Sequence, residues 1–162
     1  MRYNEALLIA QDVLEQLRPH CYRCEIAGSI RRKKDEVKDI EIVAIPKPYD
    51  IGLLESGIAT VVNRWEKVRG TLPCKLTQRK LPQGICVDLF FVNEDNWGYQ
   101  FALRTGSRDY NKRIILKAIE KRGYTAEGGY LKRNGVIVPV LEEEDLFKRI
   151  GVTYIPPENR FL

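Results

Sequence analysis

The sequence predicts an α+β protein in which a mixed sheet with helices is followed by a smaller, basic α+β lobe. Short β-branched and apolar runs that fit strands alternate with amphipathic stretches that fit helices. The composition, 44% hydrophobic and 30% charged, is ordinary for a soluble globular protein. With 162 residues the chain is long enough to bury a core without disulfide cross-links.

In the first part of the chain, the apolar periodicity predicts a helix over residues 5–18, capped by Asn4 and ended by Pro19. A second helix is predicted over about residues 53–65. Turns are expected at Gly28-Ser29 and at Pro82-Gln83-Gly84. The runs that fit strands cover residues 24–27, 39–45, 65–69, 75–80 and 85–92.

The remainder of the chain predicts three helices and a hairpin. The helices run from a cap at Asp95 to Leu103, from Ser107 to Gly123, and over residues 141–150. Between the last two, Asn134-Gly135 is a typical turn between two short strands. We therefore expect a first domain of residues 1–103 and a thumb-like lobe of residues 104–162.

The net charge of +5 is unevenly distributed along the chain. Residues 104–133 hold nine basic and three acidic residues, a net of +6, so the remainder nets −1. A basic lobe on a nearly neutral body favours a polyanionic partner, with nucleic acid first. The alternative is a lysine-rich surface that serves only solubility.

Neither an apolar run of membrane-spanning length nor a secretory signal is present, so we expect an intracellular, cytoplasmic protein that does not bind membranes. Four cysteines are expected as free thiols, although Cys21 and Cys24 form a C-x-x-C pair that leaves a zinc-organised domain as an alternative. His20 is the single histidine, which argues against Ser-His-Asp hydrolysis.

Three carboxylates are the candidate catalytic residues. Asp39 and Glu41 share one face of a predicted strand, because side chains alternate along a strand. Asp88 lies within another apolar strand. If the two strands are neighbours, three carboxylates converge, which suits two divalent cations, Mg²⁺ or Mn²⁺. The alternative is an exposed acidic face, with Asp88 paired to a lysine.

A phosphate-binding segment precedes the acidic strand. The turn at Gly28 and Ser29 can present backbone N–H groups and a hydroxyl to phosphate oxygens. The guanidinium of Arg32 can hold phosphate oxygens in its fork. Anion-binding groups just before paired carboxylates make a combined nucleotide and metal site physically coherent.

These pieces together resemble the family X DNA polymerases, which have a polymerase-beta-type nucleotidyltransferase palm. The Gly28-Ser29-x-Arg31-Arg32 segment followed by Asp39-x-Glu41 resembles that fold's signature. Thr105-Gly106-Ser107 with Asn111 resembles the segment that holds the sugar and base edge, and residues 143–160 resemble the family's ending. The chain looks like a minimal palm-plus-thumb form without the amino-terminal lyase and helix-hairpin-helix domains.

The resemblance implies roles for particular residues. Asp39, Glu41 and Asp88 would bind two Mg²⁺ ions, with Asp88 near the primer 3′-hydroxyl. The β- and γ-phosphates of the nucleotide would be bound by Gly28, Ser29 and Arg32, its sugar by Thr105 and Gly106, and its base edge by Asn111. Arg113, Lys117 and Lys121, which recur every four residues on one helix face, would contact DNA.

Several positions depart from the family pattern. Glu41 stands where many members have aspartate, and Leu103-Arg104 stand where well-known members have an aromatic pair. Cys86 and Ile115 stand where DNA polymerase beta has arginines. These departures leave the rejection of ribonucleotides and dependence on a template open, although Lys112 or Arg113 could substitute near the template.

We therefore expect a metal-dependent DNA polymerase for gap filling and repair, which takes dNTPs and a primer/template or gapped duplex. One alternative is a template-independent nucleotidyltransferase acting on another 3′ end or acceptor. Another is a non-catalytic DNA-binding module that retains the fold. The sequence leaves the oligomeric state open.

Overall fold

The computed structural model describes residues 1–50 and 56–161 of the chain. Their contacts divide the chain into two compact units, Met1–Val92 and Asn93–Leu162. Each unit has its own cluster of buried hydrophobic residues. The boundary predicted after Leu103 falls within helix α4 (Trp97–Thr105); as a division between functional domains it stays a prediction.

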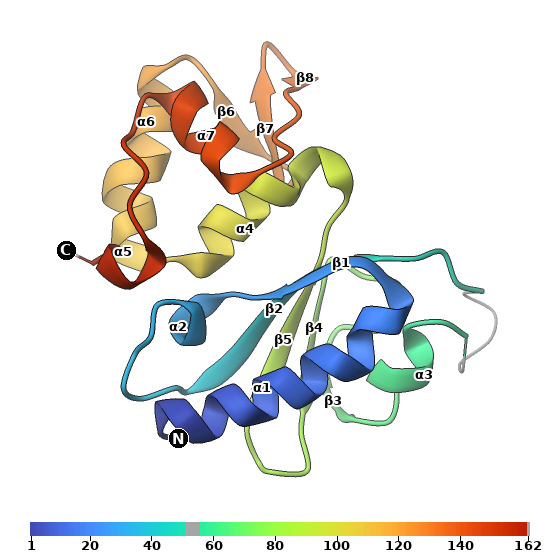
Figure 1. Cartoon of the computed structure of the whole chain (residues 1–162). Helices are drawn as coiled ribbons and strands as arrows, with labels where there is room; N and C mark the ends of the chain where they lie inside the picture. Colours follow the sequence, from blue (N-terminus) through green and yellow to red (C-terminus); the bar gives the residue numbers. More distant parts are fainter. Residues whose placement is uncertain (51–55, 162) are drawn as a thin grey trace. The chain divides into compact units, whose positions relative to one another are not determined.

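A five-stranded sheet forms the body of the first unit, with strand order β1-β2-β5-β4-β3 (Figure 1). Strands β2 and β5 are parallel, whereas the other neighbouring pairs are antiparallel. The predicted mixed sheet is thus confirmed. Its strands are β1 (Cys21–Ile26), β2 (Asp39–Pro46), β3 (Glu66–Arg69), β4 (Leu76–Lys80) and β5 (Cys86–Phe91).

Helix α1 (Tyr3–Leu17) lies across one face of this sheet (Figure 1) and supplies five residues to the core, Ala6, Ala10, Val13, Leu14 and Leu17. The helix begins one residue before Asn4, so the predicted cap at Asn4 is wrong. The Tyr3 backbone N–H donates to the carbonyl of Asp35 at 3.0 Å. This tertiary contact satisfies a helix-terminal N–H that a local side-chain cap would otherwise take.

Other local predictions for the first unit need adjustment. Gly28-Ser29 is the start of a one-turn helix, α2 (Gly28–Arg31), where a simple turn was predicted. The predicted helix over residues 53–65 is the short α3 (Ala59–Val62), while residues 53–55 lie outside the described part of the chain. The 3₁₀ turn η1 (Arg18–His20) follows α1 where Pro19 was expected to end the helix.

The second unit contains the predicted helices and hairpin. The 3₁₀ turn η2 (Glu94–Asn96) precedes α4, and the side chain of Asn93, rather than that of Asp95, forms the cap. A helical segment follows Ser107, as predicted, and the Ser107 side chain caps it. That segment comprises α5 (Arg108–Tyr110), the π-helical turn η3 (Asn111–Ile115) and α6 (Leu116–Lys121).

A small sheet and the last helix complete this unit. The predicted hairpin is present as β7 (Tyr130–Arg133) and β8 (Val136–Ile137). Strand β6 (Thr125–Glu127) pairs with β7, which gives the order β6-β7-β8. The sequence gives little sign of β6 because all three of its residues are exposed. Helix α7 (Glu143–Ile150) and the 3₁₀ turn η4 (Pro157–Asn159) follow.

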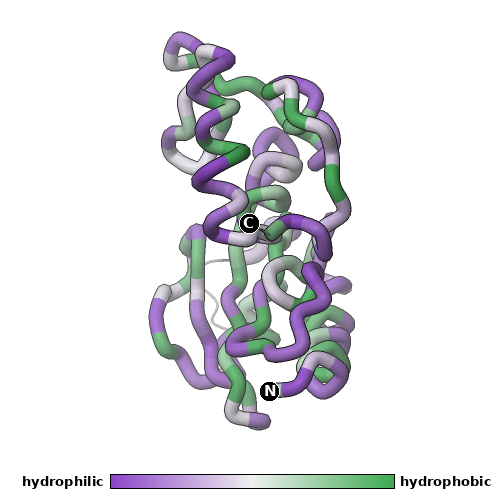
Figure 2. Tube along the Cα trace, turned by 90° about the vertical axis from the view of Figure 1, so that its left-hand side faces the viewer, coloured by the Kyte–Doolittle hydropathy of each residue, from purple (hydrophilic) through white to green (hydrophobic). Residues whose placement is uncertain are grey.

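Hydrophobic residues are interrupted by hydrophilic ones along the whole trace, as the green and purple segments of Figure 2 show. Among the described residues, none of the helices is both long enough and apolar enough to cross a membrane.

Candidate functional site

The two carboxylate-bearing strands are direct neighbours. In the parallel pairing of β2 with β5, Glu41 lies opposite Asp88 and Asp39 lies opposite Cys86. Because side chains alternate along each strand, Asp39, Glu41 and Asp88 all belong to one face of the sheet. The opposite face carries Ile40, which is fully buried in the core beneath α1. The condition on which convergence of the three carboxylates depended is therefore met.

Asp88 is the most buried of the three candidate catalytic residues. Its side chain is only 8% exposed, whereas Asp39 and Glu41 are half-buried. Gln78 of β4, which pairs with Asp88 across the sheet, donates a hydrogen bond from Nε2 to Asp88 Oδ1 at 2.8 Å. This contact orients the Asp88 carboxylate, and sequence reasoning missed it because only the register of β4 against β5 reveals it.

The predicted phosphate-binding segment lies against the acidic strand. The Ala27 N–H donates to the Glu41 carbonyl at 2.8 Å, which ties the start of α2 to β2. Gly28 has φ of +62°, and a Cβ at this position would overlap the Glu41 carboxylate. The structure thus brings Gly28 and Glu41, predicted on separate motifs, into direct contact.

Arg32 and Ser29 complete this part of the site. Partial burial lowers the pKa of the Arg32 guanidinium, and the negative charge of Glu41 acts in the opposite direction. The Ser29 hydroxyl oxygen is buried and has no hydrogen-bond partner within residues 1–50 and 56–161. A buried hydroxyl in that situation costs about 1–3 kcal/mol, so an oxygen acceptor on a ligand would suit it.

The chemistry of the donor set fits Mg²⁺ or Mn²⁺, because the carboxylates offer only hard oxygen ligands. In the part of the chain that the structure describes, no three His, Cys, Asp or Glu side chains are gathered closely enough to hold a metal ion. The Glu41 carboxylate rests against Gly28 and within the electrostatic reach of Arg32. The three carboxylates therefore lie on one face of the sheet, but they are not close enough together in this structure to coordinate one metal ion.

The C-x-x-C pair lies in the core of the first unit. Cys21 and Cys24 are both buried and both free, and an irregularity in the strand pairing between Cys21 and Arg23 puts them on the same side of β1. A hydrogen bond between the two thiols lowers the pKa of Cys21 and raises that of Cys24. The pair thus contributes to core packing of the first unit.

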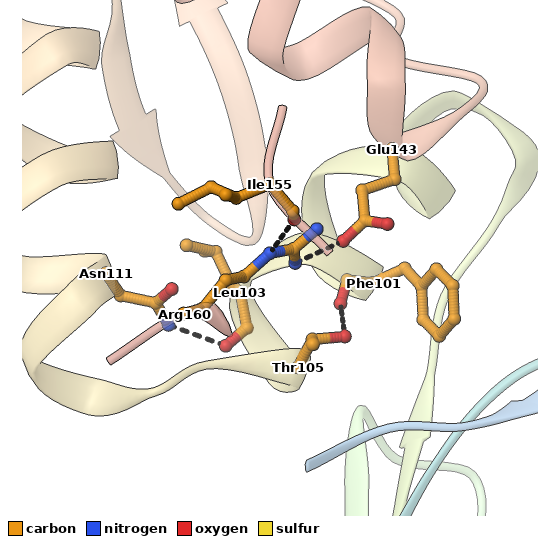
Figure 3. Close-up of polar contacts among 7 residues, drawn as sticks. All are labelled: Phe101, Leu103, Thr105, Asn111, Glu143, Ile155 and Arg160. Carbon is orange, nitrogen blue, oxygen red and sulfur yellow. Dashed lines mark hydrogen bonds and ion pairs between the residues drawn. The ribbon is translucent and has the colours of Figure 1, made fainter. Parts of the chain in front are cut away.

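In the second unit, the residues expected at the nucleotide sugar and base lie around the end of α4. The Thr105 hydroxyl donates to the Phe101 carbonyl at 2.6 Å, and Asn111 Nδ2 donates to the Leu103 carbonyl at 2.6 Å (Figure 3). Gly106 follows the helix with φ of +74°. Asn111 Oδ1 is buried without a hydrogen-bond partner among the described residues, which leaves an acceptor for a ligand donor.

A buried ion pair holds the C-terminal segment beside these residues. Arg160 Nη1 donates to Glu143 Oε1 at 2.6 Å, and Arg160 Nε donates to the Ile155 carbonyl at 2.9 Å (Figure 3). Both charged side chains are at most 3% exposed. The guanidinium also lies 5.0 Å from the ring centroid of Phe147. The sequence singled out this segment only by resemblance; the structure shows how it anchors the second unit.

The predicted DNA-contact residues occupy an exposed helix face. Arg113, Lys117 and Lys121 are all exposed, while Ile115 and Ile119 on the other side of the segment are buried. Ile115, which stands where DNA polymerase beta has an arginine, is fully buried in the core of the second unit. It is therefore a core residue and does not face solvent.

Comparison with a family model locates a known domain in the second half of the chain. The model of the DNA polymerase beta thumb matches residues 101–161. The match begins within α4 and includes the basic helix face, the three-stranded sheet and the buried ion pair. The thumb-like character predicted for this part of the chain agrees with the match.

The matches to two similar proteins cover nearly the whole chain. DNA polymerase/3'-5' exonuclease PolX of Bacillus subtilis (strain 168) is 29% identical over 163 residues, which cover 96% of this chain. The chain spans 27% of the length of that relative. A crystal structure of Leishmania infantum polymerase beta, described as a ternary P/T complex, matches with a TM-score of 0.77 at 20% identity. It covers 100% of this chain and 77% of that one, which shows the fold. The thumb model, the bacterial relative and the solved structure together support a family X polymerase-like minimal form for this chain.

Proposed function

We propose that this chain catalyses metal-dependent nucleotidyl transfer from a dNTP to a DNA 3′-hydroxyl, with release of pyrophosphate, in gap filling and repair. The observation that carries the proposal is the register of β2 against β5, which sets Glu41 beside Asp88 with Asp39 on the same face. The anion-binding segment that starts at Gly28 lies against Glu41. Carboxylates next to groups that bind phosphate are what in-line phosphoryl transfer requires.

Asp39, Glu41 and Asp88 would hold two Mg²⁺ ions, with Mn²⁺ as a possible substitute. When bound, such ions neutralise the charge that develops on the phosphoryl and leaving-group oxygens. Gln78 donates to Asp88 Oδ1 at 2.8 Å, so the Asp88 carboxylate has a defined orientation. In this proposal Asp88 accepts the proton of the primer 3′-hydroxyl, which it can do from an oriented, nearly buried position.

The remaining site residues would bind the nucleotide. The buried Ser29 hydroxyl would donate a hydrogen bond to a phosphate oxygen. The Arg32 guanidinium, which now interacts electrostatically with Glu41, would instead bind the β- and γ-phosphates. In the second unit, Thr105 and Gly106 would line the sugar, and Asn111 would accept a hydrogen bond from the base edge through Oδ1.

DNA as the acceptor is supported by the kinds of protein that the chain resembles. The bacterial relative is a DNA polymerase and 3'-5' exonuclease, and the solved structure is that of a polymerase beta in a ternary P/T complex. The exposed basic face of Arg113, Lys117 and Lys121 offers contacts to a phosphate backbone. Such contacts are independent of sequence, as synthesis on any primer requires.

Template-independent transfer is the second candidate, and the burial of Ile115 favours it. A side chain that is fully buried in the core cannot reach a templating base. Lys112 and Arg113, which are exposed on the same helical segment, are the basic residues left for that contact.

Primer extension tests the proposal on a gapped duplex, an open primer/template and a bare single strand, with Mg²⁺ or Mn²⁺. Asp39→Asn and Asp88→Asn should each lower incorporation at least about a hundredfold, because metal ligation contributes several kcal/mol to transition-state stabilisation. Asp35→Asn, the same change at an exposed position, is the matched control.

Full activity in either carboxylate variant would remove the two-metal assignment. Extension of the single strand alone would favour template-independent transfer. Retained DNA binding without incorporation on any substrate would favour a non-catalytic DNA-binding module.

A further inference from the structure

Arg79 of β4 lies on the sheet face opposite the carboxylates. Its neighbour Gln78 faces Asp88, so alternation directs Arg79 to the other side, where it pairs in register with Val87. Val87 is fully buried in the core that α1 covers, and Arg79 itself is only 4% exposed. A guanidinium is thus buried well away from the proposed catalytic face.

The hydrogen bonds of Arg79 all go to neutral acceptors. Nε donates to Thr77 Oγ1 at 3.0 Å, while Nη1 and Nη2 reach the carbonyls of Trp65 and Gly70 at 3.4 Å each. Two of these three bonds are long, and a guanidinium has more N–H groups than these acceptors take. Burial lowers the pKa of Arg79, and the neighbouring Cys74 acts in the opposite direction.

Buried charges in proteins are normally compensated by an ion of opposite sign. For Arg79, no carboxylate within residues 1–50 and 56–161 forms that pair. The three contacts explain how Arg79 ties β3 to β4, but they leave its positive charge uncompensated.

Arg79 contributes to the lining of a pocket of about 380 Å³. Lys67 at its edge donates from Nζ to Thr71 Oγ1 at 2.9 Å, which directs a second cation toward it. The pocket has two basic residues, no acidic residue and an apolar wall; its lining is Asn63, Trp65, Lys67, Thr71, Leu72 and Arg79. Its volume lies within the usual range for sites that bind small molecules.

We propose that this pocket binds a small organic anion, a carboxylate or phosphate monoester on a flat apolar body. The fork of Arg79 takes the charged head in the geometry that guanidinium groups favour. Trp65 and Leu72 pack against the body, and Lys67 adds a charge at the rim. The pocket and the carboxylates lie on opposite faces of the sheet, so this proposal stands or falls separately from the proposed function.

The chain's two tryptophans allow the pocket to be observed directly. After labelling with 5-fluorotryptophan, the ¹⁹F spectrum should have one resonance from Trp65 in the pocket and one from Trp97 at the start of α4 in the second unit, assigned with Trp65→Phe. Titration with benzoate and with phenyl phosphate should shift the Trp65 resonance saturably and leave that of Trp97 in place. Neutral benzamide should bind more weakly than either anion, and the tighter anion identifies the head group.

Variants test the role of charge without relying on the fold-critical Arg79. Lys67→Gln should weaken anion binding about two- to fivefold, the range for an exposed ion contact. Lys80→Gln, the same change on an exposed residue of β4 outside the pocket, should leave it unchanged. The proposal is overturned if neither anion gives a saturable shift, if benzamide binds as tightly as benzoate, or if the two lysine variants lose affinity equally.

Discussion

Gly28 has no side chain, and this allows the phosphate-binding segment to lie directly against the Glu41 carboxylate. Its φ of +62° is costly for any other residue, and its Cβ position is already taken by the Glu41 carboxylate. Gly84, in the turn before β5, has φ of +90° but nothing within 4 Å of a Cβ. An alanine at Gly84 would therefore introduce backbone strain alone, whereas an alanine at Gly28 would introduce both strain and steric overlap.

We expect Gly28→Ala to lower the free energy of unfolding by about 2–4 kcal/mol, because left-handed strain and overpacking add. Gly84→Ala should lower it by only about 1–2 kcal/mol, since strain acts alone there. Urea denaturation of both variants measures the difference. Equal losses would mean that the Glu41 carboxylate moves aside at no cost.

The buried pair of Glu143 and Arg160 is the second residue-scale feature. Glu143→Gln leaves the Arg160 charge buried without its counter-charge, and breaking such a pair costs about 3–5 kcal/mol. The neighbouring Glu144→Gln makes the same chemical change at an exposed position and should alter stability by less than about 0.5 kcal/mol. Chemical denaturation measures the free energy of unfolding of both variants. A loss below about 0.5 kcal/mol in both would show that the ion pair does not anchor the C-terminal segment.

At the scale of elements, the helical segment from α5 to α6 separates a core face from a basic face. The turn η3 is π-helical, so one extra residue enters the turn between α5 and α6. After it, Ile115 and Ile119 lie in the core while Lys117 and Lys121 lie in solvent. The segment can therefore bind a polyanion along one side without disturbing its packing.

We expect Lys117→Ala to weaken DNA binding to all sequences alike and to reduce the slope of log K against log salt by about 1, the loss of one phosphate contact. Lys148→Ala removes the same charge from an exposed position on α7 and serves as the control. Fluorescence anisotropy over a series of salt concentrations gives both slopes. An unchanged slope for Lys117→Ala would remove this residue from the DNA interface.

At the scale of the whole molecule, the chain has two hydrophobic cores that draw on separate stretches of sequence. One is built from α1 and the large sheet, and the other from α4, the basic helical segment and α7. Units with their own cores open by their own local equilibria. A destabilising change in one core should therefore lower the stability of that unit and leave the other unit unaffected.

Phe147→Ala tests this organisation, because Phe147 is 1% exposed and belongs to the second core. Truncating such a residue costs about 3–5 kcal/mol. Hydrogen exchange followed by mass spectrometry should show faster exchange across residues 93–161 and unchanged protection in α1 and β2. Leu89→Ala, in the first core, should give the reverse pattern. Uniformly faster exchange in both variants would mean that the chain unfolds as one cooperative unit.

The kinds of element, and the face of each element that carries charge, could be predicted from local sequence patterns. All five strands of the large sheet, the helical segment after Ser107 and the Asn134-Gly135 hairpin were predictable. So was the common face of Asp39 and Glu41. These features depend on interactions between residues near in sequence, whose periods of 2 and 3.6 are visible in a single chain.

Which residues of distant segments become neighbours could be seen only in the folded chain. The pairing of Glu41 with Asp88, the bond from Gln78 and the contact of Gly28 with Glu41 depend on strand order and register. Register is set by the summed packing of a whole sheet, to which each residue adds little, so no local pattern encodes it. Likewise the chain starts α1 before Asn4 because a distant carbonyl satisfies the helix terminus, and Arg79 is buried because it lies on the sheet face where its partner Val87 packs into the core. Long-range contacts of this kind outweigh local preference because burial and hydrogen bonding across the sheet exceed the fraction of a kilocalorie that separates one cap or turn from another.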